Sequence, residues 1–315
     1  MDVVEILERA GGIAGRAALV ALSSRAEVDR ALRQGAVVRD GHGRYALPVA
    51  DAARRAANRI DGVVSHRSAA LLHGWEVKTT PPEPDVLVPK NRKVAPWRRQ
   101  GIALHRDPSG QCVRRVTSPE RTVLDCMRAL PFDEALAVAD SALRHGSFTQ
   151  PELVVLAADA RGPGAARCRR VAGQADGRAA NPFESVLRAI ALDVSGLDVR
   201  PQVEITGRGF SVRPDLVDVE RRLVLEADSF AWHGDRASLR WDAQRYNNLV
   251  VRGWLVLRFA WEDVMHDPCL RPHPHRRRGT RRSTYQLVGA GPSRRLSARV
   301  FRALGRSTYV SSRPG

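Results

Sequence analysis

Apolar residues recur at helical spacing three times near the start of the chain and then alternate with polar residues. The helical stretches cover residues 3–10, 15–23 and 24–34. Ser24 is suited to cap the third predicted helix, and Gly35 is suited to end it. The alternation around Asp40 and Gly41 predicts a β-hairpin. Three helices followed by a β-ribbon predict a winged helix-turn-helix over residues 1–50, whose third helix would enter the major groove of DNA.

Five arginines on this predicted domain are candidate DNA contacts. They are Arg25, Arg30 and Arg33 on the third helix, and Arg39 and Arg44 on the ribbon. Guanidinium groups on a recognition helix can bond both phosphates and base edges. A winged helix that binds another protein, with its arginines facing water, is the open alternative.

The next segment, residues 51–160, mixes strand and helix patterns. Strands are expected over 84–90 and 102–107, and amphipathic helices over 118–130 and 132–146. We interpret His66 and His73 as structural, because neither belongs to a recognisable catalytic or metal-binding cluster. A shift to Gly, Ala and Arg between residues 160 and 180 predicts a domain boundary.

The C-terminal domain, expected over residues 178–268, contains a hairpin that carries acidic side chains on one face. With a turn at Glu220 and Arg221, Asp215 lies directly opposite Glu226. The other face would be apolar and would carry Phe210, Val212, Pro214, Leu216, Leu223, Leu225 and Ala227. Opposed like charges repel, so this pairing requires a cation or a proton between the carboxyl groups.

A divalent cation would remove the repulsion, and Mg²⁺ is commonly held by one or two carboxylates, several waters and a phosphate oxygen. Asp215 and Glu226 are therefore candidate metal ligands. Glu184 lies near the start of a helix predicted over 181–192. It is either a third acid of this site or the capping-box partner of Asn181.

Arginines near the hairpin have two open roles. Arg213 faces Asp228 in the predicted register, so the two could form a surface ion pair. Arg240 and Arg245 lie on a helix predicted after the hairpin. Together with Arg213 they are candidate contacts to the phosphates of a nucleic acid, or they are solvated surface charges.

The first 150 residues resemble the N-terminal part of AbiEi-type antitoxin and regulator proteins. The resemblance rests on the ribbon ending at 43–48, on "SHRSAALLHGW" at 65–75 and on the helical stretch 116–143. It implies DNA binding, autoregulation and a link to toxin-antitoxin or defence systems.

Residues 180–265 resemble the PD-(D/E)XK nuclease superfamily, and more narrowly its very-short-patch-repair (Vsr)-like branch. The matching stretches are 181–188, 213–234 and 240–264. The resemblance implies that Asp215 and Glu226 bind Mg²⁺ or Mn²⁺ with support from Glu184. Asp228 stands where the superfamily motif has lysine. The Vsr-like branch lacks that lysine and uses histidine, which makes His233 the candidate substitute.

Composition changes this picture mainly at the C-terminus. The net charge is +17, and twelve arginines but no acidic residue follow Asp267. Residues 269–315 are therefore expected to form a basic, disordered tail, which either binds nucleic acid without sequence preference or is dispensable. The four cysteines are widely spaced, which indicates neither a zinc site nor a disulfide framework. With no apolar run of membrane length and no signal pattern, a cytoplasmic location is expected.

Together these patterns predict an α/β protein, α+β overall, with a restriction-endonuclease-like mixed sheet flanked by helices in its C-terminal domain. The expected function is metal-dependent endonucleolytic cleavage of DNA, in a defence, repair or toxin-antitoxin setting with a corresponding partner protein. The alternative is a DNA-binding regulator or antitoxin whose nuclease fold is inactive. RNA remains an open substrate, and the pattern does not define the oligomeric state.

Overall fold

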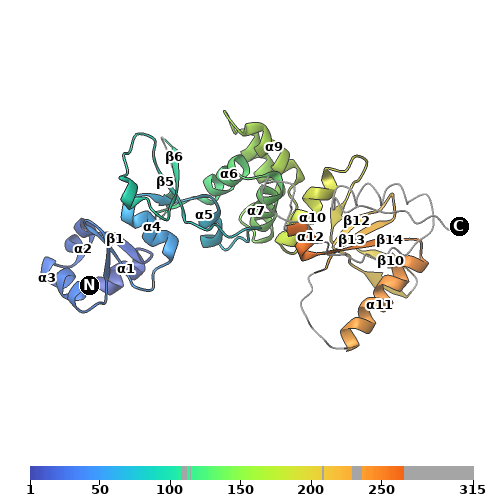
Figure 1. The fold of residues 1–315 in the computed structure, drawn as a ribbon, viewed down its shortest axis with the longest axis horizontal. Coiled ribbons are helices and arrows are strands. Elements are labelled where there is room, and N and C mark those ends of the chain that lie inside the picture. Colours follow the sequence, from blue (N-terminus) through green and yellow to red (C-terminus); the bar gives the residue numbers. More distant parts are fainter. Residues whose placement is uncertain (108–111, 114, 208, 229–235, 266–315) are drawn as a thin grey trace, which may run out of the picture. The chain divides into compact units, whose positions relative to one another are not determined.

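The chain forms two compact units in a computed structural model, which describes residues 1–107, 112–113, 115–207, 209–228 and 236–265. One unit joins residues 1–131 with 145–173, and the other joins 132–144 with the chain from 174 onward. Both consist of helices and small β-sheets, in agreement with the predicted α/β class (Figure 1).

The first unit begins with the predicted winged helix. Its elements are α1 (Val3–Arg9), β1 (Ile13–Gly15), α2 (Arg16–Leu22), α3 (Arg25–Arg33), β2 (Val38–Gly41) and β3 (Arg44–Ala46). The three strands form an antiparallel sheet in the order β1-β3-β2. The Oγ atom of Ser24 accepts a hydrogen bond from the Glu27 amide at 3.2 Å, which confirms the predicted cap of α3.

The winged helix differs from the sequence prediction in two details. Strand β1 was not predicted, because three residues are too few to show a period. The turn of the ribbon falls at His42 and Gly43 and not at Asp40 and Gly41, since β2 continues through Gly41 with a register shift after Arg39. Gly43 adopts a φ of 66°, which a residue without a side chain tolerates at little cost.

The ribbon is fastened to the next helix, α4 (Ala52–Ile60). Asp40 accepts hydrogen bonds from Arg55 at 2.9 Å and from the Asn58 amide at 3.0 Å. The same Asn58 amide also donates to the Tyr45 carbonyl at 3.0 Å. Because Asn58 is fully buried, these bonds fix the ribbon against α4.

The rest of the first unit packs around a five-stranded sheet in the order β6-β5-β4-β8-β7. Its remaining elements are β4 (Val63–Val64), α5 (His66–Leu72), β5 (Asp85–Pro89), the 3₁₀ helix η1 (Pro96–Arg98), β6 (Ala103–Asp107), β7 (Cys112–Val113), β8 (Val116–Thr117), α6 (Pro119–Ala129), α8 (Gln150–Ala158) and α9 (Ala165–Gln174). Helix α9 occupies the stretch where the sequence suggested only a boundary, and it buries Cys168, Val171 and Ala172.

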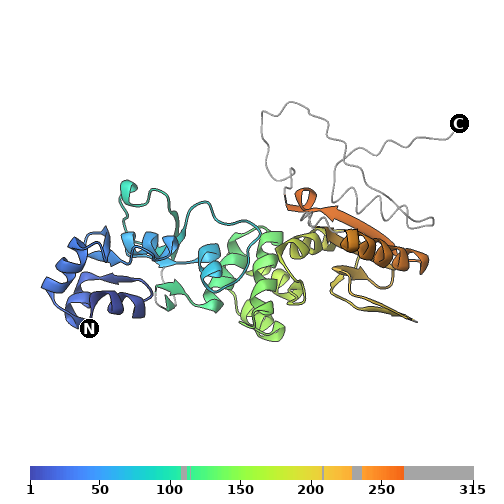
Figure 2. The same cartoon turned by 90° about the horizontal axis from the view of Figure 1, so that it is seen from below.

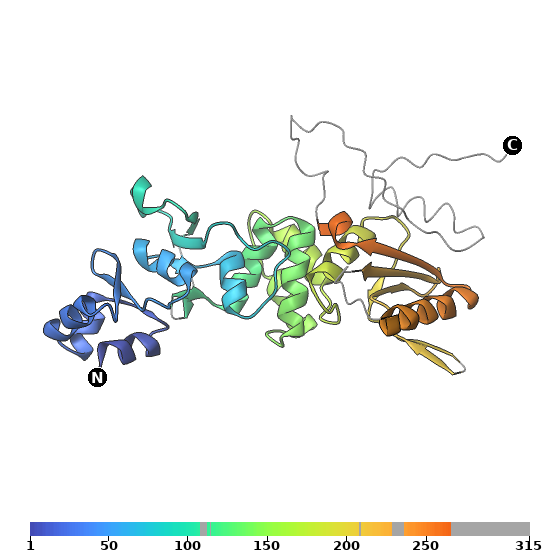
Figure 3. The ribbon, with the colours of Figure 1, turned by 60° about the horizontal axis from the view of Figure 1, so that its bottom comes forward.

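The second unit has a four-stranded sheet in the order β14-β13-β12-β9. Its elements are α7 (Phe132–Arg144), α10 (Pro182–Leu192), β9 (Arg200–Pro201), β10 (Ile205–Gly207), β11 (Phe210–Val212), β12 (Leu216–Asp218), β13 (Leu223–Asp228), α11 (Arg236–Val251), β14 (Leu255–Ala260) and α12 (Trp261–Met265). Strands β13 and β14 are parallel, and the other pairs are antiparallel. Helices α10 and α12 cover one face and α11 the other, while the β10–β11 ribbon projects from the unit (Figure 3).

The predicted hairpin register is confirmed, since Leu216 pairs with Leu225 and Val217 with Val224. Its predicted apolar face is wrong in one respect: Phe210 and Val212 belong to the separate β10–β11 ribbon and pack with the Val217 face. Pro214 explains the separation, because it has no amide hydrogen with which to continue the ladder from β11 into β12.

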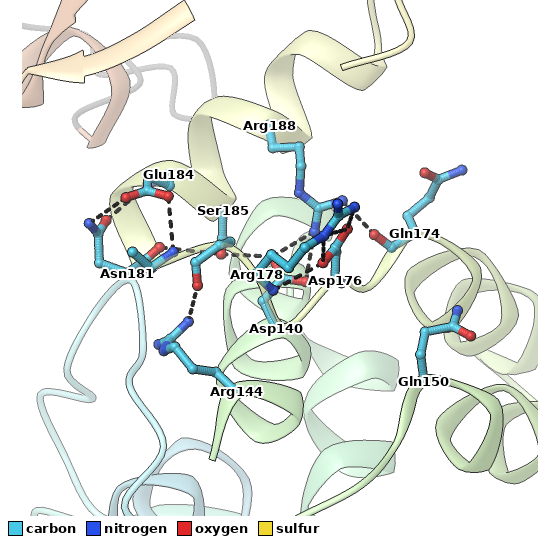
Figure 4. Close-up of polar contacts among 12 residues, drawn as sticks. Asp140, Arg144, Gln150, Gln174, Asp176, Arg178, Asn181, Glu184, Ser185 and Arg188 are labelled. Carbon is cyan, nitrogen blue, oxygen red and sulfur yellow. Dashed lines mark hydrogen bonds and ion pairs between the residues drawn. The ribbon is translucent and has the colours of Figure 1, made fainter. Parts of the chain in front are cut away.

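Helix α7 belongs to the second unit because of a buried polar network with α10 (Figure 4). Asp140 accepts a bond from Nη2 of Arg188 at 2.6 Å and from Oγ of Ser185 at 2.7 Å. The Asp176 amide donates to the same carboxylate at 2.8 Å. Asp140 is 0% exposed and Arg188 is 3% exposed, so the pair is isolated from water.

Candidate functional site

The predicted carboxylate pair lies where β12 and β13 meet. Asp215 immediately precedes β12, and the strand register brings it opposite Glu226 of β13. The Ala227 amide donates to Oδ2 of Asp215 at 2.8 Å, which fixes the orientation of that side chain. Glu226 is buried, and its Oε1 atom has no hydrogen-bond partner among the described residues. A buried oxygen of this kind is costly unless something further binds it.

The surroundings favour neutral carboxyl groups at this position. Burial, and next the charge of Asp215, raise the pKa of Glu226 to about 8. Burial also raises the pKa of Asp215, against the opposing effect of the Ala227 amide. The nearby positive charge of Arg245 offsets only part of this effect, and a bound cation would offset more of it.

Glu184 makes hydrogen bonds at the start of α10, although these do not form the predicted capping box with Asn181. Its Oε1 accepts from the Asn181 side chain at 3.0 Å and its Oε2 accepts from the Ala180 amide at 2.9 Å, so it stabilises the start of α10 (Figure 4). It is also close enough to the pair for the charge of Asp215 to raise its pKa, after the larger effect of burial. Glu184 thus lies beside the carboxylate pair while already engaged in hydrogen bonds.

Gln202 connects Glu184 with Asp215 and was not predicted as a site residue. Its side-chain Nε2 donates to Oε2 of Glu184 at 3.0 Å, and its backbone amide donates to the Asp215 backbone carbonyl at 2.9 Å. Its φ is 56°, an uncommon left-handed conformation for a residue with a side chain. No pattern in one sequence signals such a position.

Two arginines bring positive charge to the carboxylates. Nη2 of Arg245 on α11 lies 3.2 Å from Oε2 of Glu226. Arg258 on β14 pairs with Asp228 at 2.5 Å. Both guanidinium groups also lie over the ring of Tyr246, at 4.9 and 4.5 Å from its centre. Tyr246 therefore holds the two cations next to the acidic face.

Other predicted site residues have different outcomes. Arg213 lies 4.0 Å from Glu204, so the predicted pair with Asp228 does not form; β11 separates from β12 before that register can continue. His233 lies outside the described residues, as does the side chain of Arg240, although Arg240 falls on α11. The tail over 269–315 is likewise outside them.

A divalent cation fits the chemistry of the pair but not a larger cluster. Asp215 and Glu226 present hard oxygen donors, one of them unpartnered, as a Mg²⁺ ion that retains several waters prefers. Within the described ranges, no three His, Cys, Asp or Glu side chains are grouped so as to hold a metal ion by themselves. The carbonyl of Ala227 and water would have to complete the coordination.

The candidate DNA contacts of the winged helix fall into two groups. Arg25, Arg30 and Arg33 on α3 are exposed and have no ion pair within the described part of the chain. Arg39 donates to the Gly41 carbonyl at 3.2 Å and stays exposed. Arg44 instead pairs with Asp61 at 2.5 Å, so its charge is already used inside the protein.

The histidines of the middle segment make structural contacts. His66 is buried and stacks on His105, with 3.7 Å between ring centres. His105 bonds Asp85 at 2.8 Å, and Nε2 of His73 bonds the Thr117 carbonyl at 2.9 Å.

Two further expectations concern thiols and membranes. Cys126 and Cys168 are buried free thiols. None of the described helices combines the length and apolar character needed to cross a lipid bilayer.

Comparisons with known proteins provide little further information. No family model matches the chain, and no curated protein matches it. One solved structure, the RV2827C protein from Mycobacterium tuberculosis, is 16% identical over 61% of this chain and 74% of that protein, with a TM-score of 0.26.

Proposed function

We propose that this protein is a metal-dependent DNA endonuclease that carries its own DNA-binding winged helix. The observation that supports this most directly is the pair of half-buried Asp215 and buried Glu226, with an unpartnered oxygen on Glu226. Even with Arg245 beside Glu226, burial disfavours ionisation of these two facing acids, and such acids are retained most readily where they bind a cation.

The residues would divide the chemistry as follows. Asp215 and Glu226 would hold Mg²⁺ or Mn²⁺, with Glu184 and Gln202 fixing the position of Asp215. The ion would stabilise negative charge on the scissile phosphate and lower the pKa of a bound water. His233 is proposed to accept a proton from the attacking water, because Asp228 occupies the place of the motif lysine.

Positive charge around the pair would position the substrate. Arg245 lies beside Glu226, and Arg258 lies beside Asp228, both near the C-terminal end of β13. Guanidinium groups next to a hydrolytic site can bind the phosphates that flank the cleaved bond. The exposed arginines of α3 would supply the second contact to DNA.

Cleavage of supercoiled plasmid by the purified full chain tests the proposal. Reactions contain Mg²⁺, Mn²⁺ or EDTA, and compare wild type with the double variant Asp215→Ala/Glu226→Ala. A matched control, Asp198→Ala/Glu220→Ala, removes two exposed carboxylates from the same unit. Metal-dependent nicking or linearisation that persists in the control and disappears in the site variant is expected. Binding without cutting in every metal would reject the enzyme.

A regulator or antitoxin with an inactive nuclease fold is the second candidate. The observation that favours it is the ion pair between Asp228 and Arg258, which engages the position where the motif lysine would stand. Under this alternative, wild type and both double variants would bind DNA equally and cut none. Expression of a reporter from the protein's own upstream DNA would then fall when the protein is supplied.

A further inference from the structure

A strongly basic loop follows β5 in the first unit. Residues 86–106 contain no Asp or Glu, and two of the three lysines of the chain, Lys90 and Lys93, are among them. The segment after β5 stands away from the strands (Figure 2). Trp97, within η1, is 76% exposed, and the guanidinium of Arg98 lies 5.9 Å from its ring centre. An exposed tryptophan beside cationic side chains offers a ring face on which a nucleic-acid base can stack.

Hydrogen bonds and an ion pair attach the loop to the C-terminal end of α4. Arg98 donates to the Arg59 carbonyl at 2.5 Å, and Arg59 donates to the Gln100 carbonyl at 2.8 Å. Arg92 lies 3.3 Å from the carboxylate of Asp61. These contacts fasten the loop to the C-terminal end of α4, so Trp97 is presented by a fixed support.

Other cations of the loop remain free. The side chains of Lys90, Lys93 and Arg99 are exposed and form no ion pair with any described residue. Trp97 and Arg99 line an open depression of about 690 Å³, together with Glu83, Pro96, Gln100 and Ile102. The depression thus offers an aromatic face, amide and guanidinium donors and one carboxylate.

The same end of α4 also holds the ribbon of the winged helix. Asp61, which pairs with Arg92 of the loop, also pairs with Arg44 of the ribbon. A β-carbon on Gly41 of the ribbon would lie 3.6 Å from Nη2 of Arg98. The basic loop and the ribbon are therefore neighbours within one unit, and a nucleic acid bound at the ribbon would pass close to the loop.

We propose that the loop over residues 90–101 is a second DNA-binding surface, on which an unpaired base stacks on Trp97 while Lys90, Lys93 and Arg99 contact the adjoining phosphates. The proposal rests on DNA binding by the winged helix. Stacking on an aromatic ring combined with backbone cations is the general mode by which proteins bind single-stranded nucleic acid. The expected ligand is a duplex that continues into an unpaired strand.

Fluorescence anisotropy with labelled DNA in EDTA tests this without cleavage. The two ligands are a blunt duplex and the same duplex with a short single-stranded dT tail. Wild type should bind the tailed duplex about tenfold more tightly, and Trp97→Ala should remove that advantage whereas Trp97→Phe retains most of it. Lys90→Ala/Lys93→Ala/Arg99→Ala should also lower the magnitude of the slope of log K against log salt concentration by about 2.

A matched control removes three exposed arginines elsewhere in the same unit, as Arg161→Ala/Arg169→Ala/Arg170→Ala, and should bind like wild type. If the loop variants bind both ligands like wild type, while Arg25→Ala/Arg30→Ala/Arg33→Ala abolishes binding, the loop surface is rejected and the winged-helix proposal stands. If wild type binds neither ligand, both are rejected.

Discussion

The guanidinium of Arg245 lies 3.2 Å from the carboxylate of Glu226, on the side of β13 that faces α11. Glu226 therefore already has one cation beside it. A divalent ion bound by Glu226 would compete with this arginine for the same carboxylate. The relation between these two residues leads to the first prediction.

Arg245→Ala should strengthen metal binding and should lower the stability of the metal-free protein. Removing the nearby positive charge should lower the Kd for Mn²⁺ about tenfold, because like charges no longer oppose each other. In EDTA the free energy of unfolding should fall by about 1 kcal/mol, since the pair is only partly exposed. Calorimetric titration with Mn²⁺ and thermal unfolding measure both. Arg245→Lys, which keeps the charge, should behave like wild type; an unchanged Kd in the alanine variant would contradict the competition.

Asp215→Asn should abolish cleavage and stabilise the metal-free fold by about 1 kcal/mol. The gain is expected because the substitution removes a carboxylate whose ionisation is disfavoured by burial, as the raised pKa of Asp215 indicates. Asp218→Asn is the contrasting variant, because the Asp218 carboxylate accepts bonds from the amides of Asp198 and Arg221 at 3.0 Å. Asp218→Asn should lower the free energy of unfolding by about 1–3 kcal/mol, while the proposed metal ligands Asp215 and Glu226 are unchanged. Chemical denaturation in EDTA measures the free energy of unfolding of both variants. A change in the same direction for both would contradict the prediction.

Separating Asp140 from Arg188 should destabilise the second unit severely. Asp140→Leu or Arg188→Met alone leaves a charge buried without its partner, which costs about 3–5 kcal/mol. The double variant Asp140→Leu/Arg188→Met should cost less than the two single changes together, because no buried charge remains. Urea unfolding of the four proteins forms a double-mutant cycle. Additive losses would show that the pair does not act as a unit.

The first unit should lose stability as the solution becomes mildly acidic. Burial, and next the charge of His105, lower the pKa of His66 from 6.5 to about 3. The unfolded chain therefore takes up a proton below about pH 6.5 that the folded chain excludes, so the contribution of His66 is intact above that pH and is lost progressively toward pH 3. At pH 5 the loss is about 2 kcal/mol.

Thermal unfolding of wild type and His66→Gln at pH 7.5 and 5.0 measures this dependence. The variant should be less stable at pH 7.5 but show a smaller decrease on acidification. Equal decreases in both proteins would assign the acid sensitivity to other groups.

Some arginines of the winged helix should contact DNA, whereas Arg44 should only stabilise the fold. Replacing Arg30 and Arg33 by alanine should weaken binding to duplex DNA and reduce the salt dependence of log K by about 0.9 for each lost phosphate contact. Arg44→Ala should leave that dependence unchanged and lower the melting temperature, because Arg44 is paired with Asp61. Anisotropy over a salt series, with melting curves, distinguishes the two effects.

Local patterns predicted much of the fold because they depend on neighbouring residues. Ser24 and Asn181 cap their helices as expected, since capping involves only the next three residues. The pairing of Leu216 with Leu225 followed from a short turn and strict alternation. The candidate carboxylate pair was therefore available from the sequence.

Long-range partners were not predictable in the same way. Nothing near Asp140 indicates that Arg188 pairs with it, and the strand that would have placed Arg213 against Asp228 breaks at Pro214. Gln202 acquires its position from a left-handed backbone and two partners distant in sequence. These features depend on how the helices and strands pack against one another. The hydrophobic periodicity of a single sequence does not reveal such packing.

The position of helix α7 in the chain affects how the second unit can recombine and how it folds during synthesis. It precedes α8 and α9 in the chain but completes the packing of α10. Recombination with a single breakpoint near residue 174 would therefore not transfer the second unit intact. During synthesis α7 also emerges from the ribosome well before α10, so the Asp140 side of α7 has to stay uncovered until the later helix is made.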